Sequence, residues 1–228
     1  MKRRVMLLSP LALLGAQKHS YQFHRRYPVT RGVMDIDVVN GEVRVKAGAV
    51  QEIRVQAEIE LTAPIVEDLE LAKREVHFEP RLEGETFRVW VENPEQRQRQ
   101  RYSYRHNVEV EMPAGMRLIL RGVNGAVQVS YTTLPEKDIY IKNVNGEIEI
   151  EFPKELQADF QLKTLNGNIY TGFEMKEIPG KTETAVTERG MRRIVSRNRY
   201  AGGRVGRGGI EVRVEGLNGD IRILERKA

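Results

Sequence analysis

Residues 139–150, IYIKNVNGEIEI, decide the fold, because their pattern returns at four other places in the chain. Apolar and polar side chains alternate on either side of an Asn-Gly pair, as is typical of a strand with one buried face. The equivalent segments are 34–45 (MDIDVVNGEVRV), 118–129 (LILRGVNGAVQV), 160–171 (FQLKTLNGNIYT) and 210–223 (IEVRVEGLNGDIRI). In all five, the fourth residue before Asn is apolar, the third is charged, the residue directly before Asn is apolar, and the third residue after it is β-branched.

The Asn-Gly pairs are expected to be structural turns, because Asn tolerates left-handed backbone angles and Gly adopts them freely. They are Asn40 and Gly41, Asn124 and Gly125, Asn145 and Gly146, Asn166 and Gly167, and Asn218 and Gly219. The second, third and fourth pairs are 21 residues apart, and the first precedes the second by 84 residues, four times 21. The last interval is 52 residues, which indicates an insertion into a repeating unit.

Two all-β architectures fit this pattern. In a β-solenoid, a single-stranded β-helix-like stack of coils of about 21 residues, each Asn-Gly is a corner between stacked strands. In an antiparallel sandwich of β-hairpins, each Asn-Gly is a type I′ turn, and Asp37 lies opposite Arg44. A straight hairpin would expose the apolar residue directly before Asn, whereas a bend would turn it inward. The solenoid is therefore the predicted fold.

The chain is expected to contain an export signal and one domain. Residues 1–16 resemble a signal peptide, because a basic start precedes an apolar run that is too short to span a bilayer. Residues 17–30 are predicted to be an N-terminal linker, and residues 31–228 a single β-repeat domain with an irregular insertion at 174–208. One short helix is expected after Pro64. We therefore expect a periplasmic, cell-surface or secreted protein with no transmembrane span after signal cleavage.

Charge and cysteine content narrow the function classes. The chain has 37 Lys and Arg against 32 Asp and Glu, a net charge of +5, and three of these cations lie in the predicted signal peptide. The remaining balance of +2 does not indicate a nucleic-acid partner. The absence of cysteine excludes a disulfide scaffold and thiolate metal sites.

No motif points to catalysis, a metal or a cofactor. The four histidines, at 19, 24, 77 and 106, lack metal-ligand spacing, so neither an enzyme nor a bound metal is expected. Two polar, arginine-rich segments are the candidate contacts for an anionic envelope ligand. Their arginines are Arg97, Arg99, Arg101, Arg105, Arg192, Arg193, Arg197 and Arg199.

The chain resembles a bacterial family of putative adhesins of unknown function. The resemblance rests on MDIDVVNGEVRV, on MPAGMRLILRGVNGAVQV at 112–129 and on GGRVGRGGIEVRVEGLNGDIRI at 202–223, and it extends over about residues 30–225. It implies an exported, β-solenoid-like domain without catalytic residues to transfer. The predicted function is a non-enzymatic binding or scaffolding module of the bacterial envelope, with an envelope polymer, a glycan or another envelope protein as partner. The alternative is a carbohydrate-active enzyme of the β-helix type, which would be favoured by three or more carboxylates and an arginine in one cleft.

Overall fold

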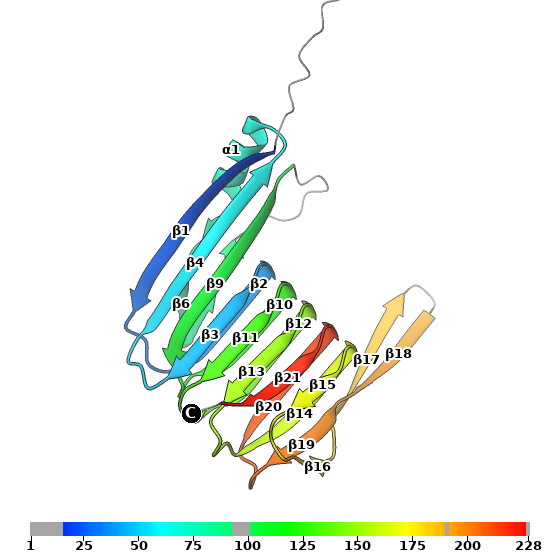
Figure 1. Cartoon of the computed structure of the whole chain (residues 1–228). Coiled ribbons are helices and arrows are strands. Elements are labelled where there is room, and N and C mark those ends of the chain that lie inside the picture. Colours follow the sequence, from blue (N-terminus) through cyan, green and yellow to red (C-terminus); the bar gives the residue numbers. More distant parts are fainter. Residues whose placement is uncertain (1–15, 93–100, 190–191, 227–228) are drawn as a thin grey trace, which may run out of the picture.

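Two large β-sheets face each other along the molecule (Figure 1). The computed structural model describes residues 16–92, 101–189 and 192–226, so residues 1–15 of the predicted signal peptide lie outside the described residues. One sheet has eight strands and the other nine, and both mix parallel with antiparallel neighbours. Their inner faces supply one continuous apolar core.

The eight-stranded sheet is parallel from β9 to β15, and β1 and β4 extend it in antiparallel fashion. In spatial order its strands are β1 (Gln17–Tyr27), β4 (Ile53–Ala63), β9 (Ser103–Pro113), β3 (Val43–Gly48), β11 (Val127–Tyr131), β13 (Ile148–Phe152), β21 (Ile221–Glu225) and β15 (Ile169–Thr171).

The nine-stranded sheet is parallel from β14 to β7 and ends in antiparallel strands on both sides. In spatial order its strands are β16 (Lys176–Ile178), β19 (Ala201–Val205), β14 (Ala158–Asn166), β20 (Ile210–Asn218), β12 (Ile139–Asn145), β10 (Arg117–Asn124), β2 (Val33–Asn40), β7 (Thr86–Val89) and β6 (Arg81–Glu83). Two further pairs stand apart, β17 (Thr182–Arg189) with β18 (Arg192–Arg199) and β5 (His77–Phe78) with β8 (Val91–Glu92).

Each Asn-Gly pair carries the chain from the nine-stranded sheet to the eight-stranded sheet, as from β12 to β13. Gly146 shows why glycine is needed there. Its φ is 134°, and a Cβ at this position would lie 2.2 Å from the carbonyl oxygen of Gly125 in the neighbouring corner. Its N–H donates to the carbonyl oxygen of Asn218 on the other side, at 2.9 Å. The corners therefore stack backbone on backbone, without space for a side chain.

The predicted β-solenoid is wrong, because the strands form two large mixed sheets rather than a stack of coils. In a solenoid each coil packs on the one before it in the chain. Here β20, which precedes the fifth Asn-Gly, lies between β12 and β14, which precede the third and fourth. The hairpin alternative is also wrong, because Asp37 and Arg44 belong to strands of different sheets.

The inward bend predicted before each Asn is also wrong. The strand keeps its period of two up to the corner, so the apolar residue directly before Asn faces outward. Val39, Leu217 and Leu165 are 38%, 40% and 65% exposed. The residue that faces inward is the one two positions before Asn. Its polarity differs from segment to segment, because it is Val38, Gly122, Asn143, Thr164 and Gly216 in turn.

Asn143 shows what the inward position does. It is buried, and its Nδ2 donates to the carbonyl oxygens of Gly125 at 2.9 Å and Gly146 at 3.1 Å. Gly122 and Gly216 flank it in register on the adjacent strands. A Cβ at Gly122 would lie 2.5 Å from the Asn143 Oδ1. Small neighbours therefore make space for an amide that binds two corner carbonyls from inside.

Three segments differ from or refine the sequence expectations. Residues 17–30, predicted as a linker, contain β1, whose His19, Tyr21 and Phe23 alternate with more exposed polar residues. The insertion at 174–208, predicted as irregular, contains β16, β17, β18 and β19. The short helix expected after Pro64 is α1 (Val66–Glu75), which packs on β4 and β1.

Candidate functional site

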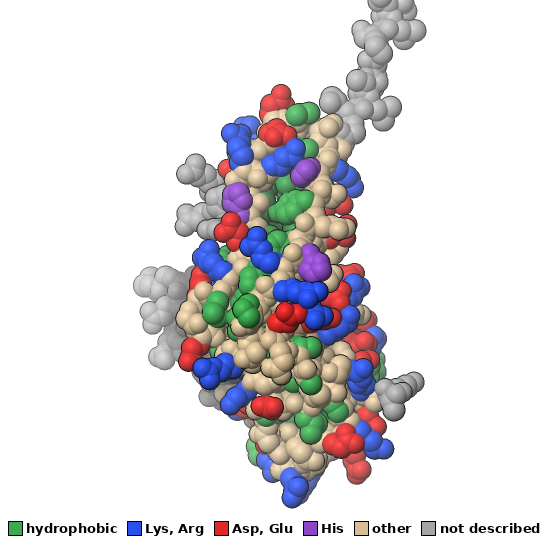
Figure 2. Space-filling model, turned by 90° about the vertical axis from the view of Figure 1, so that its left-hand side faces the viewer, with side chains coloured by type: hydrophobic (Ala, Val, Ile, Leu, Met, Phe, Trp, Pro, Cys, Tyr) green, Lys and Arg blue, Asp and Glu red, His purple; other side chains and the backbone are tan. Residues whose placement is uncertain are grey.

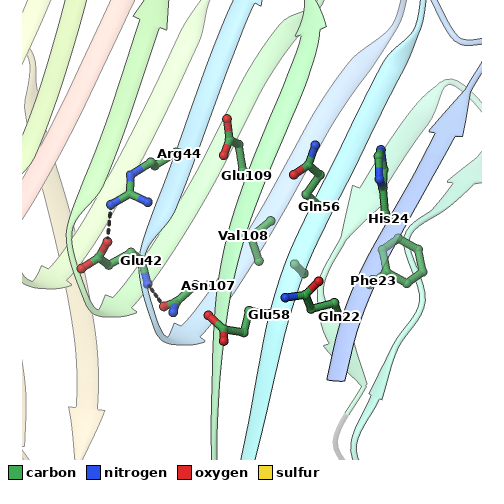
Figure 3. A pocket seen from close by; sticks show the side chains of 11 residues that line it. Gln22, Phe23, His24, Glu42, Arg44, Gln56, Glu58, Asn107, Val108 and Glu109 are labelled. Carbon is green, nitrogen blue, oxygen red and sulfur yellow. Dashed lines mark hydrogen bonds and ion pairs between the residues drawn. The ribbon is translucent and has the colours of Figure 1, made fainter. Parts of the chain in front are cut away.

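A polar groove lies on the outer face of the eight-stranded sheet, across β1, β4, β9 and the corner that leads into β3 (Figure 3). Its volume is about 260 Å³, which suits a short segment of a ligand held at a surface rather than an enclosed small molecule. The lining residues are Gln22, Phe23, His24, Glu42, Arg44, Gln56, Ala57, Glu58, Asn107, Val108 and Glu109.

Strand alternation places the polar lining. Gln56 and Glu58 lie on the outer face of β4, while Ala57 between them is buried in the core. The register puts His24 of β1 beside Gln56. It puts Asn107 of β9 beside Glu58. Neighbouring strands are about 4.8 Å apart, so the groove presents successive rows of polar side chains.

Part of the lining is held by ion pairs. Arg44 Nη2 donates to Glu42 Oε2 at 2.7 Å, and Arg44 Nε donates to the Oε1 of Gln128 at 3.1 Å. Lys46 Nζ lies 2.5 Å from Glu109 Oε1. Asn107 Oδ1 accepts from the backbone N–H of Glu42 at 3.1 Å, which orients its amide beside the corner (Figure 3).

The other polar side chains of the lining are available to form hydrogen bonds with solvent or a ligand. The side chains of Gln22, Gln56, Glu58 and His24 are exposed and have no hydrogen-bond partner within the described part of the chain. Two amides, a carboxylate and an imidazole together offer both donors and acceptors. The groove therefore contains a fixed charged border and a set of unused polar groups.

Sequence reasoning missed this groove because one wall is β1, which lies in the segment predicted to be a linker. The signal for a strand was the alternation in residues 17–27, where His19, Tyr21, Phe23 and Tyr27 share one face. The structure also brings three carboxylates, Glu42, Glu58 and Glu109, together with Arg44 in this groove.

Charges of both signs are mixed over the surface around the edge of β1. Figure 2 shows this side, with basic and acidic side chains interspersed and hydrophobic side chains visible between them. Among the described residues, no group of three or more His, Asp or Glu side chains is placed to hold a metal ion. His106 is 1% exposed, and burial lowers its pKa to about 4. Its imidazole therefore belongs to the core and not to the surface.

The five turn asparagines form a continuous ladder of side-chain amides. Each Nδ2 donates to the Oδ1 of the next asparagine, in the order Asn166, Asn218, Asn145, Asn124 and Asn40. The four distances lie between 2.7 and 2.9 Å. The ladder links adjacent corners, so the asparagines are structural residues of the fold.

The arginines predicted to contact an anionic ligand fall into two separate places. Arg101 lies just before β9 and Arg105 near its start, and Arg101 Nη1 is 3.6 Å from the buried Asp68 of α1. The sequence positions 192, 193, 197 and 199 belong to β18, which runs into β19 at the opposite end of the sheets (Figure 1). Arg97 and Arg99 lie outside the described residues. The structure therefore does not bring the two groups together.

A buried tyrosine anchors the base of the β17–β18 pair. Tyr200 is 2% exposed, and its hydroxyl donates to Glu215 Oε1 at 2.5 Å and accepts from Arg213 Nη2 at 2.8 Å. Burial, with the hydrogen bond and charge of Glu215, raises the pKa of Tyr200. Lys181 accepts the Tyr200 N–H at its carbonyl and pairs through its ammonium with Glu211.

Within the described residues, no helix combines the length and apolar character that a membrane crossing requires. No family model matches the chain, and no curated protein matches it.

Several solved structures are similar to the chain in part. One is a putative cell adhesion protein from Clostridium sporogenes, with 10% identity over 93% of this chain and 100% of the other and a TM-score of 0.46. A putative adhesin from Bacteroides fragilis has 6% identity over 90% and 97% of the two chains, with a TM-score of 0.23. A putative lipid binding protein from Parabacteroides distasonis has 8% identity over 90% and 97%, with a TM-score of 0.25. At these scores the likenesses assign neither a family nor a function.

Proposed function

We propose that this chain is a non-enzymatic, exported binding module of the bacterial envelope, and that the groove across β1, β4 and β9 holds a hydroxyl-rich ligand such as a glycan. The observation that carries the proposal is the set of exposed polar side chains in that groove that have no partner among the residues the structure describes. Planar amide and carboxylate groups form paired hydrogen bonds with neighbouring hydroxyls, because they present two polar atoms side by side.

The charge of the groove favours a neutral ligand over an ion. Glu42 is paired with Arg44 and Glu109 with Lys46, so Glu58 is the carboxylate without an ion pair among the described lining residues. An anionic polymer would meet this carboxylate directly, and a cation would find a single charge at an exposed site. A neutral polyhydroxyl ligand uses Glu58 as an acceptor and the amides of Gln22 and Gln56 as donors and acceptors.

Export rests on the basic start and apolar run of residues 1–16. Expression of the full chain in a bacterium should place the protein outside the cytoplasm, with a mature N-terminus close to residue 17. Recovery of the intact chain from the cytosol would contradict export.

A binding screen tests the function. The purified chain is applied to an array of bacterial capsular, cell-wall and lipopolysaccharide glycans, and the affinity of each hit is then measured in solution. Gln56→Ala and Glu58→Ala should each weaken binding by about fivefold to tenfold, because each removes roughly one ligand hydrogen bond. Gln51→Ala is the matched control, since Gln51 is exposed and lies outside the groove. Unchanged affinity in both groove variants, or no glycan bound, would contradict the proposal.

One observation favours a second candidate, a carbohydrate-active enzyme. The groove contains three carboxylates and Arg44, the combination named above as favouring the enzyme alternative. Two of these carboxylates already form ion pairs, which supports binding rather than proton transfer. Incubation of the bound glycan with the chain, with and without calcium, separates the candidates. The binding proposal predicts an intact polymer, whereas fragments that disappear with Glu58→Gln would establish the enzyme.

A further inference from the structure

The two large sheets end in four edge strands, and one of them differs from the others. Edge strands carry unpaired backbone groups, and charged side chains protect them from pairing with another chain. Three edges have such charges: β1 has Lys18, Arg25 and Arg26, β6 has Arg81 and Glu83, and β16 has Lys176 and Glu177. The fourth edge, β15, consists of Ile169, Tyr170 and Thr171 and has no charge.

Among the described residues, no strand pairs with the outer side of β15. The carbonyl oxygen of Asn168 accepts from the Ile221 N–H at 2.9 Å, and the Gly172 N–H donates to the Ile223 carbonyl oxygen at 2.8 Å. In a parallel pair, alternate residues of a strand bond to the same neighbour. The backbone groups of Tyr170 therefore face β21, and those of Ile169 and Thr171 face away from it.

The side chains at this edge are also partly exposed, although the Arg222 guanidinium lies over the Tyr170 ring, 5.8 Å from its centroid. Ile169 is 37% exposed although it shares the core-facing row of Ile221, and Tyr170 is 48% exposed. Leu165, at the end of β14, is 65% exposed. The nine-stranded sheet continues past β14 with β19 and β16, whereas the eight-stranded sheet stops at β15 (Figure 1). An added strand beside β15 would extend the shorter sheet.

We propose that β15 pairs in antiparallel fashion with β15 of a second copy of this chain, which joins two eight-stranded sheets across a two-fold axis at Tyr170. The register is self-complementary. Ile169 of one copy faces Thr171 of the other, and each such pair exchanges two N–H···O=C bonds, because both residues direct their backbone groups outward. The two Tyr170 residues meet as a pair without mutual hydrogen bonds, the position at which cross-strand side chains approach most closely.

A second copy is the favoured occupant because the edge fits itself. The strand is uncharged, so two copies meet without like-charge repulsion, and the exposed apolar side chains are buried on both sides at once. Such an interface is small, so the dimer should be weak, with a dissociation constant between about 1 and 100 µM.

Sedimentation velocity of the purified full chain at increasing concentration tests the proposal. The wild-type chain should dimerise below about 500 µM, and Tyr170→Lys should raise the dissociation constant by about tenfold or more, because it places two ammonium groups opposite each other. Leu134→Lys is the matched control, since Leu134 is 45% exposed and lies in the loop between β11 and β12. It should leave the dimer unchanged.

Two variants of opposite charge at position 170 distinguish a loss of strand pairing from a loss of folding. Tyr170→Lys and Tyr170→Glu should each dimerise about tenfold or more weakly than the wild type when alone, whereas an equimolar mixture should form a heterodimer more tightly than either variant forms a homodimer, because the charges are opposite. Amide hydrogen exchange at residues 169 and 171 should slow with increasing wild-type concentration. A monomer at 500 µM, equal effects of Tyr170→Lys and Leu134→Lys, or no heterodimer in the mixture would each overturn the proposal. None of these results depends on whether the groove binds a glycan.

Discussion

The stacked corners predict that Gly146→Ala is far more damaging than a typical glycine substitution. Gly146 has a φ of 134°, and its N–H donates to the Asn218 carbonyl oxygen at 2.9 Å. A Cβ there would lie 2.2 Å from the Gly125 carbonyl oxygen. Because the obstructing atom belongs to the backbone, the neighbouring corner has to move as a unit.

The expected cost adds two effects. Positive φ costs a non-glycine residue about 1–2 kcal/mol. Displacement of the corner weakens the Gly146 N–H bond and the Asn143 bonds to the corner carbonyls, at about 1 kcal/mol each. We expect a loss of about 4–5 kcal/mol, which for a domain of this size lowers Tm by about 8–20 °C. Thermal unfolding followed by circular dichroism measures it.

Gly84→Ala is the matched control. Gly84 also has positive φ, at 61°, but a Cβ at this position meets no heavy atom within 4 Å. Gly84→Ala should therefore lower the free energy of unfolding only by the cost of positive φ, about 1–2 kcal/mol. Equal losses in Tm for the two variants would show that the corners are not in close backbone contact.

Two further predictions concern buried polar side chains. His106 has its pKa lowered by burial from 6.5 to about 4, so the unfolded chain takes up a proton before the folded chain does. Ionisation of His106 should therefore leave the free energy of unfolding unchanged above pH 6.5 and lower it by about 3 kcal/mol towards pH 4. In denaturant titrations, His106→Leu should flatten this dependence of stability on pH. An unchanged dependence would contradict the burial argument. The same Tyr→Phe change should have opposite signs at two sites. Tyr131→Phe removes a buried hydroxyl that has no partner in the described residues and should raise stability by up to about 1 kcal/mol, whereas Tyr200→Phe removes the donor to Glu215 and should lower it by about 1–2 kcal/mol. Losses of equal size in Tm at both sites would refute this difference.

Local pattern predicted the strands better than their arrangement. The five aligned segments indicated strand, turn and strand, and the register pairs Asn145 with Asn124 and with Asn218. The error came from reading the apolar Val144 as buried. The residue that faces inward is Asn143, next to Val144, and its side-chain amide binds the carbonyl oxygens of the corners. Polarity alone does not reveal that an amide is needed inside.

The order of the strands was not accessible from the sequence. The strand β20 inserts between β12 and β14 although 43 residues lie between the end of β14 at Asn166 and the start of β20 at Ile210. Equal spacing of three turns favoured sequential stacking, but spacing carries no information about which neighbour a strand selects. The groove was missed for the same reason, because it combines β1, β4 and β9, which are distant in the chain.

Hydrogen exchange measured with and without a bound glycan, taken from the array screen, addresses the binding proposal most directly. Binding in the groove predicts slower exchange in peptides that contain residues 22–24, 56–58 and 107–109, together with unchanged exchange around Tyr140 and Arg213 on the outer face of the opposite sheet. Protection confined to that opposite face, or to the β17–β18 pair, would place the ligand elsewhere and contradict the proposed function.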